Sequence, residues 1–420
     1  MRLSLALITG IALAGAASGA NRAMALDTPH TIHHTRSPHI IEPHHATRHA
    51  ATREAARPAT AASAHRATAT KSAARPGVHK ASVHTTRHRY YGERFTASSF
   101  ASPDVFASDV TTGEDPVVRQ AAIDALDGMN GTAVVINPAN GRILAMVNQK
   151  LALSPGAEPC STIKITVAMA ALSEGLVTRD TMVQLPGFRM NMTEALAHSN
   201  NLYFEALGRE LGFERVRHYA NEFGLGELAG YNISGEQLGV YPDHPISEAE
   251  GGVGRMCSFG QGVSLTPLQL GAYVSALANG GTLYYLQHPT TPAEIEAFQP
   301  RVKRTLDINR FVPDLEDGMA GAVEYGTARR LRASFTEFPV FGKTGTCSDS
   351  GTRFGWFASF MNAPQGSLVT VFFLEGGRPV FGPRAAELTG AFYKNLWDRN
   401  YFVDKPIQAT ASAVPASAAR

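Results

Sequence analysis

The sequence predicts a mixed α/β domain of the α+β type: an antiparallel five-stranded sheet flanked by helices, with an inserted helical subdomain. Three observations indicate this fold class. Two short runs rich in β-branched residues form a hairpin pattern at residues 131–147. A long stretch with helical spacing of apolar residues follows the hairpin. Three more strand patterns then occur, at 339–346, 354–361 and 367–375.

Each predicted element has a local signal. Residues 115–128 show the apolar spacing of a first helix. The turn between the first two strands contains Pro138, Asn140 and Gly141. Further helical patterns follow Ser161, Asn200, Thr266 and Asn309. Residues 384–397 end the domain as an amphipathic helix, so helices flank a sheet made of two early and three late strands.

Length and charge limit the functions to consider. With 420 residues, 44% hydrophobic and 18% charged, the chain holds one large or two ordinary domains plus unstructured segments. The net charge of +2 is uneven, because residues 27–94 contain eleven Lys/Arg against four Asp/Glu. The rest of the chain is therefore acidic. Without a basic patch on the folded part, we expect no nucleic-acid partner.

The two ends differ in composition from the middle. Residues 3–20 are mostly apolar and small, and Ala-Met-Ala follows at 23–25, so residues 1–25 are predicted to be a signal peptide or membrane anchor. Residues 26–94 contain eleven of the fifteen histidines and few large apolar residues, so we expect a disordered linker rich in His, Arg, Ala, Thr and Pro. A folded domain is predicted at 95–405 and a disordered tail at 406–420. Either N-terminal reading implies export, to the periplasm or the outer face of the cytoplasmic membrane.

A lysine in an apolar helix is the first sign of chemistry. Lys164 lies in the run Ile163–Ala168, in the first turn of a helix for which Ser161 is the predicted N-cap and Gly175 the predicted stop. The helix dipole and the apolar neighbours both disfavour a cation there. One turn separates Ser161 from Lys164, so the amine can contact the hydroxyl and act as its base. The alternative is a capping serine beside a lysine that extends to solvent.

Two later motifs carry similar residue types. Residues 199–201, Ser-Asn-Asn, precede a helical run and could simply cap it. Residues 343–345, Lys-Thr-Gly, lie in a strand pattern. A glycine in a strand marks a bulge or the close approach of another backbone. We interpret Gly345 as the close approach that a peptide-binding edge requires.

The order of these motifs, S-x-x-K, S-x-N and K-T-G, resembles the signature of the penicillin-interacting serine acyltransferases. Residues 131–147 are similar to the strand pair that opens the transpeptidase domain of penicillin-binding proteins. Residues 258–283 resemble a segment of their high-molecular-weight members. The resemblance covers residues 131–374 and implies a β-lactamase/transpeptidase-like fold. Where larger members carry a glycosyltransferase or pedestal domain, only the linker is present. We therefore expect a separate membrane glycan polymerase to act alongside this chain.

The resemblance also implies roles for the motif residues. Ser161 would attack a D-alanyl-D-alanine stem peptide and form an acyl-enzyme, with Lys164 as its base. Ser199 would relay a proton to the departing D-alanine, and Asn201 would hold Lys164 and the substrate amide.

The strand motif would bind the substrate. Lys343 and Thr344 would bind the terminal carboxylate of the stem peptide or of a β-lactam, with Gly345 between them and Thr346. The backbone N–H groups of Ser161 and Thr346 would form the oxyanion hole.

The implied function is that of a peptidoglycan D,D-transpeptidase inhibited by β-lactams. A D,D-carboxypeptidase, with water as acceptor, is the nearest alternative. A class D-like β-lactamase shares the motif layout, but normally has an aliphatic residue where Asn201 stands. A β-lactam or muropeptide sensor that acylates once is less favoured, because no signalling domain is visible. We expect no cofactor and no metal, since the histidines after the linker are scattered at His198, His218, His244 and His288.

The three cysteines flank these motifs. Cys160 precedes Ser161, Cys347 follows Thr346, and Cys257 precedes the 258–283 segment. Export would expose them to an oxidising environment, where an odd number leaves one thiol unpaired. We predict that one pair approaches bonding distance behind the active site. The alternative is three buried thiols.

Overall fold

The computed structural model describes residues 96–102 and 104–403. The predicted signal peptide or anchor, the linker and the tail lie outside these residues. Within the described ranges, no helix is both long and apolar enough to cross a bilayer.

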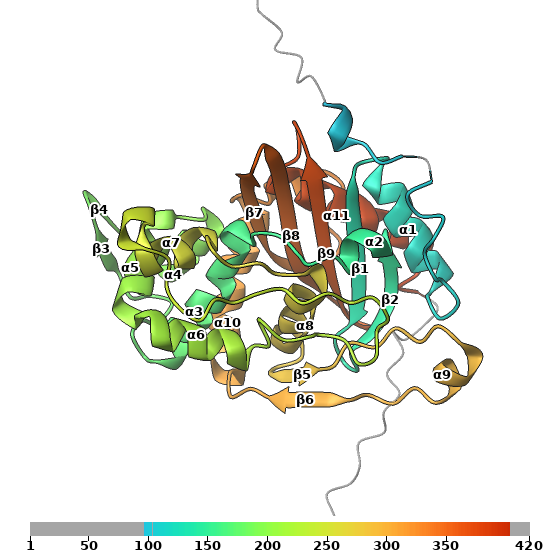
Figure 1. Cartoon of the computed structure of the whole chain (residues 1–420), viewed down its shortest axis with the longest axis horizontal. Coiled ribbons are helices and arrows are strands. Elements are labelled where there is room, and N and C mark those ends of the chain that lie inside the picture. The colour runs from blue at the N-terminus through green and yellow to red at the C-terminus, as the bar shows by residue number, and fades with distance from the viewer. Residues whose placement is uncertain (1–95, 103, 404–420) are drawn as a thin grey trace, which may run out of the picture. The chain divides into compact units, whose positions relative to one another are not determined.

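The core of the domain is one antiparallel sheet with the strand order β2-β1-β9-β8-β7 (Figure 1). The strands are β1 (Gly131–Asn137), β2 (Arg142–Val147), β7 (Val340–Asp349), β8 (Thr352–Ala363) and β9 (Gly366–Gly376). Every neighbouring pair is antiparallel. The predicted five-stranded sheet is confirmed. Because β9 returns beside β1, the last strand pattern in the sequence lies at the centre of the sheet, and β7 lies at one edge.

Helices cover both faces of the sheet. On one face, α1 (Pro116–Leu126) and α11 (Gly382–Asp398) enclose a core that includes Val135, Phe357 and Phe372. On the other, α8 (Pro267–Ala278) and α3 (Ile163–Ser173) share a second core with Trp356 and Phe373. Side chains alternate between the two faces along each strand, which separates the cores.

The helical subdomain lies beside the β7 edge (Figure 1). Its helices are α4 (Met192–Ala197), α5 (Asn201–Leu211), α6 (Phe213–Glu222) and α7 (Gly252–Phe259), with α10 (Val312–Glu324) packed against α4. The shorter helices are α2 (Gln149–Ala152) and α9 (Pro292–Glu296), with 3-10 turns η1 (Ala97–Ser99), η2 (Cys160–Thr162), η3 (Glu248–Glu250), η4 (Asn309–Phe311) and η5 (Arg329–Ala333). The inserted helical subdomain is thus confirmed.

Two small two-stranded sheets were not predicted. They pair β3 (Val183–Leu185) with β4 (Phe188–Met190), and β5 (Thr282–Tyr284) with β6 (Val302–Thr305). Strands of three or four residues are too short for an alternating pattern to stand out from the surrounding loops.

The prediction that Ser161 is an N-cap was wrong. Ser161 lies inside η2, and α3 begins at Ile163 with Thr162 as its N-cap residue. Pro159 fixes the turn, because its carbonyl accepts hydrogen bonds from both the backbone N–H and the hydroxyl of Thr162. Lys164 nevertheless lies in the first turn of α3, as predicted.

Candidate active site

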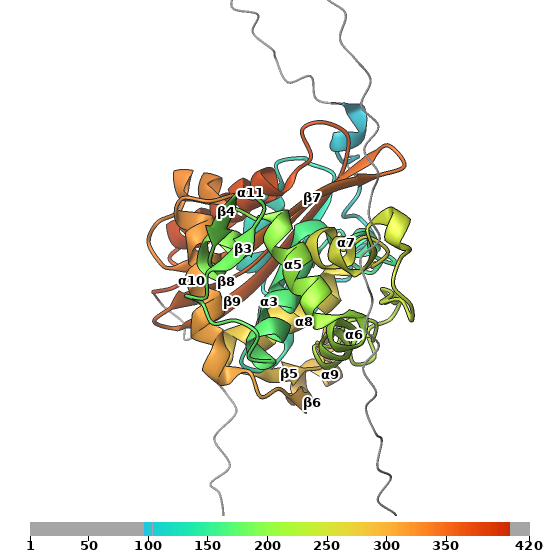
Figure 2. The ribbon, with the colours of Figure 1, turned by 90° about the vertical axis from the view of Figure 1, so that its left-hand side faces the viewer.

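The three motifs meet where the helical subdomain borders β7. Ser161 comes from η2 and Lys164 from the start of α3. Ser199 lies in the turn before α5, Asn201 is the first residue of α5, and Lys343 comes from β7. In Figure 2, α3, α5 and α7 lie together in front of the sheet. Residues far apart in the sequence therefore form one polar cluster.

Lys164 is at the centre of this cluster. Its side chain is fully buried, and Nζ lies 2.6 Å from Ser161 Oγ, 2.7 Å from Asn201 Oδ1 and 2.7 Å from the Ser258 carbonyl oxygen. Ser199 Oγ lies farther away, at 3.4 Å. Among the described residues, no carboxylate forms an ion pair with Lys164.

This geometry assigns the protons around the amine. The Ser258 carbonyl and Asn201 Oδ1 can only accept hydrogen bonds, so they take two N–H groups of Lys164. A neutral amine has two N–H groups and one lone pair. The lone pair is then left for the third close neighbour, the hydroxyl of Ser161. A neutral Lys164 can therefore receive the proton of Ser161.

Burial favours the neutral form. Loss of hydration is the main cause, and the charge of Lys343 adds to it, so the pKa of Lys164 falls from 10.5 to about 6. The charge of Glu205 acts in the opposite direction. At neutral pH the amine is then mostly unprotonated, as a general base must be.

Lys343 is the second buried lysine. Its Nζ lies 2.8 Å from Ser199 Oγ and 3.0 Å from the Thr344 carbonyl oxygen. Burial lowers its pKa to about 7. Ser199 therefore lies between the two amines, and it adopts a left-handed backbone conformation with φ 55°. Such a φ costs a non-glycine residue about 1–2 kcal/mol, and residues of this kind cluster at functional sites.

The other residues of the strand motif line the same edge. Thr344 is buried and donates a hydrogen bond from its hydroxyl to Thr327 Oγ1, at 2.7 Å. Thr346 is exposed, and its hydroxyl accepts a hydrogen bond from the Gly382 N–H at 2.8 Å.

Gly345 permits the close approach of another backbone, as predicted for a glycine in a strand. A β-carbon on Gly345 would lie 2.8 Å from the Pro159 carbonyl oxygen. The element that comes close is therefore the segment that carries Ser161, and the glycine lets β7 pack directly against it. The contact of Gly345 with a bound peptide stays a prediction.

The predicted cysteine pair is confirmed. Cys160 and Cys347 form a disulfide with a Cα–Cα distance of 5.6 Å, beside Ser161 and Thr346. Cys257 is a buried free thiol in α7.

Several contacts of the cluster were not predicted. The Ser258 carbonyl and the Thr327 hydroxyl are the clearest, and the rings of Phe204 and Phe259 each lie 5.8 Å from Lys164 Nζ. A backbone carbonyl has no signal in a sequence. Thr327 and the two phenylalanines are common residue types that only the fold brings to the site.

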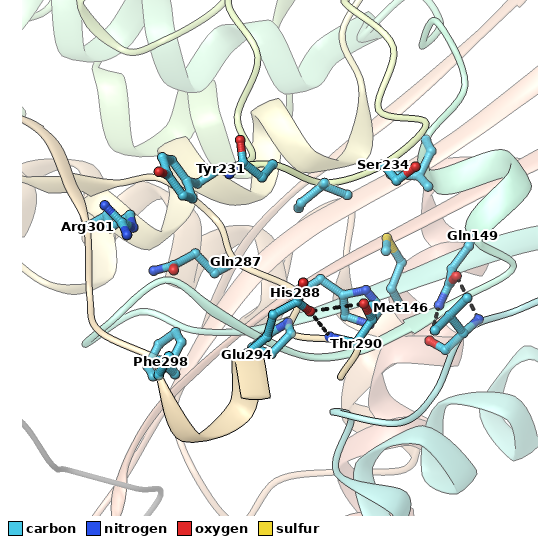
Figure 3. Close-up of a pocket in the computed structure, with 16 residues that line it drawn as sticks. Met146, Gln149, Tyr231, Ser234, Gln287, His288, Thr290, Glu294, Phe298 and Arg301 are labelled. Atoms are coloured by element: carbon cyan, nitrogen blue, oxygen red, sulfur yellow. Dashed lines mark hydrogen bonds between the residues drawn. The ribbon is translucent and has the colours of Figure 1, made fainter. Parts of the chain in front are cut away.

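Other polar features lie away from the cluster. A pocket of about 380 Å³ opens near the opposite, β2 edge of the sheet, lined by residues that include Tyr231, Gln287, His288, Phe298 and Arg301 (Figure 3). None of the predicted site residues lines this pocket. Within the part of the chain that the structure describes, no three His, Cys, Asp or Glu side chains gather as a metal site.

Comparison with known proteins shows the family of the chain. The family model of the penicillin binding protein transpeptidase domain matches residues 131–394. The chain belongs to this family. All the predicted site residues of this penicillin-binding protein domain, from Ser161 to Thr346, lie inside the match.

Individual relatives are more distant. Stage V sporulation protein D of Bacillus subtilis is 31% identical over an alignment of 264 positions, and the match covers 52% of this chain and 40% of that protein. Peptidoglycan D,D-transpeptidase MrdA of Acinetobacter baumannii is 24% identical over an alignment of 357 positions, and the match covers 67% of this chain and 52% of that protein. The chain thus spans about half the length of these curated relatives, or less.

Solved structures share the fold. The crystal structure of Pseudomonas aeruginosa PBP2 in complex with WCK 5153 matches with a TM-score of 0.56 at 23% identity. The match covers 70% of this penicillin-binding protein chain and 79% of the other.

Proposed function

We propose that the protein is a peptidoglycan D,D-transpeptidase that acts outside the cytoplasm on stem peptides and is inhibited by β-lactams. One observation carries the proposal: Nζ of the buried Lys164, which has no carboxylate partner among the described residues, lies 2.6 Å from Ser161 Oγ. A serine hydroxyl is a weak nucleophile until a base takes its proton, and Lys164 is that base.

Acylation begins at Ser161. Its Oγ attacks the carbonyl carbon of the penultimate D-alanine while Lys164 takes the proton. The C–N bond to the terminal D-alanine then breaks, and a proton passes through Ser199 to the leaving nitrogen. Ser199 is suited to this relay because its hydroxyl lies 3.4 Å from Lys164 Nζ and 2.8 Å from Lys343 Nζ. The acyl group remains on Ser161 as an ester.

Transfer reverses these roles. The amine of a second stem peptide attacks the ester carbonyl, Lys164 takes a proton from that amine, and Ser161 recovers its hydroxyl proton. The product is a cross-link between two stem peptides. We propose that a separate membrane glycan polymerase supplies the glycan strands.

The K-T-G strand recognises the carboxylate of the substrate. Lys343 is fully buried, and its charge attracts the carboxylate that the Thr344 and Thr346 side chains contact. The backbone N–H groups of Ser161 and Thr346 stabilise the oxyanion, a contribution of about 3–4 kcal/mol per donor to lowering the barrier.

Benzylpenicillin tests the nucleophile. The whole drug should add covalently to the peptide that contains Ser161, and Ser161→Ala should abolish the mass increase. We expect the adduct to persist for many minutes. Rapid turnover would favour the class D-like β-lactamase, and a folded protein that forms no adduct would contradict the proposal.

Acceptor dependence tests the transfer step. A D-alanyl-D-alanine stem peptide is supplied with and without a second peptide that carries a free amine, and the products are separated by mass. The cross-linked product should dominate when the amine is present. Release of D-alanine at the same rate in both cases, without a cross-link, would identify a carboxypeptidase. Acylation without either product would identify a sensor.

A further inference from the structure

The disulfide joins the backbones of the two proposed oxyanion donors. Cys160 is bonded through its carbonyl carbon to Ser161, and Cys347 follows Thr346 directly on β7. Each donor is therefore one residue from a bonded cysteine. The distance between the two N–H groups determines whether both can reach the same oxygen atom. The disulfide therefore restrains the distance between the two N–H groups that would bind the oxyanion.

Cys160 also has an unusual backbone. Its φ is 51°, in the left-handed region that residues with a β-carbon rarely adopt. The next residue is Ser161, so relaxation of Cys160 to an ordinary φ would rotate the peptide unit that carries the Ser161 N–H. Residues in such conformations persist when the surrounding structure holds them in place.

Non-covalent contacts hold the neighbours of Cys160. The Pro159 carbonyl binds Thr162, and the Trp356 Nε1–H donates a hydrogen bond to the Glu158 carbonyl at 3.0 Å. These bonds fix the segment before and after Cys160. The disulfide adds a covalent link from Cys160 itself to β7, across a sequence separation of 187 residues.

We propose that the Cys160–Cys347 disulfide is a positioning element of the active site, so that Ser161 is acylated at full rate only while the bond is closed. The inference rests on the proposed function and adds redox control to the same site. Cys160 and Cys347 act through Ser161 and Thr346, and neither touches the substrate.

The chemistry of opening is thiol–disulfide exchange. Cys160 is fully buried and Cys347 is half-buried, so a thiolate of a dithiol reaches the Cys347 sulfur. That attack breaks the S–S bond, forms a mixed disulfide and releases the Cys160 thiolate, which takes a proton. The second thiol of the reductant then attacks the reductant sulfur that is bonded to Cys347. This attack releases the Cys347 thiol. The dithiol leaves as a cyclic disulfide, having supplied two electrons and two protons.

The first test compares the oxidised protein with protein reduced by dithiothreitol. The limiting rate of benzylpenicillin acylation at Ser161 is measured for both, and peptide mapping without reductant reports the bond. We expect reduction to lower this rate by about 10- to 100-fold, since small displacements of reacting groups have effects of that size. Equal rates with the bond fully open would overturn the inference. An oxidised, folded protein that is not acylated would instead reject the proposed function, and the inference with it.

Two double variants separate positioning from simple cross-linking. Cys160→Ala/Cys347→Ala and Cys160→Gly/Cys347→Ala both lack the bond, but only glycine accepts a φ of 51° without strain. The glycine variant should therefore recover much of the acylation rate that the alanine variant loses. Thermal unfolding confirms that both are folded at the assay temperature. Identical rates for the two variants would show that the bond acts as a cross-link only, against the inference.

Cys257→Ala is the matched control. This variant keeps the disulfide and removes the buried free thiol of α7. It should be acylated at the wild-type rate and should slow on reduction as the wild type does. If reduction no longer slows acylation in Cys257→Ala, the effect of the reductant arises from the Cys257 thiol. That result would overturn the inference.

Discussion

Two regions at opposite edges of the sheet bury charged side chains in different ways. Beside β7, Lys164 and Lys343 are buried, and neither forms an ion pair within the described residues. Near β2, Arg119 lies 2.7 Å from both Asp109 and Glu114, whose side chains are 1% exposed. His288 lies on the other side of Glu114, at 3.1 Å.

The partners decide what burial does to each group. Burial alone would lower the pKa of Arg119, but its hydrogen bonds to Asp109 and Glu114 raise that pKa above the ordinary value. Lys164 is buried more deeply and has no carboxylate partner among the described residues, and burial lowers its pKa to about 6. A paired buried cation is a structural cross-link. An unpaired one becomes a base at neutral pH.

The largest effect is expected from Lys164→Met. Methionine fills a similar volume, so the protein should stay folded, but Ser161 loses its base. The rate of benzylpenicillin acylation should fall by about 100- to 10 000-fold, the usual contribution of a positioned general base. Stopped-flow or quenched mass spectrometry measures this rate. Acylation near the wild-type rate would contradict the difference drawn between Lys164 and Arg119, because Lys164 would then have no chemical role.

Arg119→Met should affect stability instead. The change leaves Asp109 and Glu114 without their cation, which should lower the free energy of unfolding by about 3–5 kcal/mol. Urea denaturation measures this loss, and the folded protein should be acylated at the wild-type rate. Arg399→Met is the matched control, since the pair of Arg399 with Asp124 is exposed and should contribute less than about 1 kcal/mol. Slower acylation by folded Arg119→Met would contradict the structural role.

Lys343→Met sharpens the comparison within the site. The charge of Lys343 lowers the pKa of Lys164, so its removal should move that pKa upward and shift the acidic limb of the acylation profile to higher pH. Glu205→Gln should move the limb the other way, because the charge of Glu205 raises the same pKa. The pH dependence of acylation measures both shifts. Shifts in the same direction would exclude this electrostatic account.

Residue chemistry explains which features could be predicted from the sequence. A chemical role for Lys164 could be predicted because a cation is unfavourable in an apolar helical run. The sheet could be predicted because its long strands have recognisable strand patterns in the sequence. The 3-10 turn at Ser161 was not, since a serine before a helix has the same pattern whether it caps the helix or precedes the cap.

Long-range pairs were the least predictable features. The Asp109–Arg119–Glu114–His288 network joins segments as much as 174 residues apart, and charged residues of these types are common on surfaces. The sequence predicted a close pair among three cysteines that adjoin motifs expected to meet, but it did not indicate which two would bond. Where no motif marks both partners, the contact depends on the fold itself.

The pH profile of acylation tests most directly whether Lys164 is a neutral base. The second-order rate constant for reaction of Ser161 with benzylpenicillin is measured from about pH 5 to about pH 9, which reports groups of the free enzyme. The account predicts a rise with a midpoint near pH 6, as Lys164 loses its proton, and a decline above about pH 7, as Lys343 loses its charge. A constant that instead climbs about tenfold per pH unit between pH 7 and pH 9 would show that Lys164 keeps the pKa of an ordinary lysine, and would contradict the account.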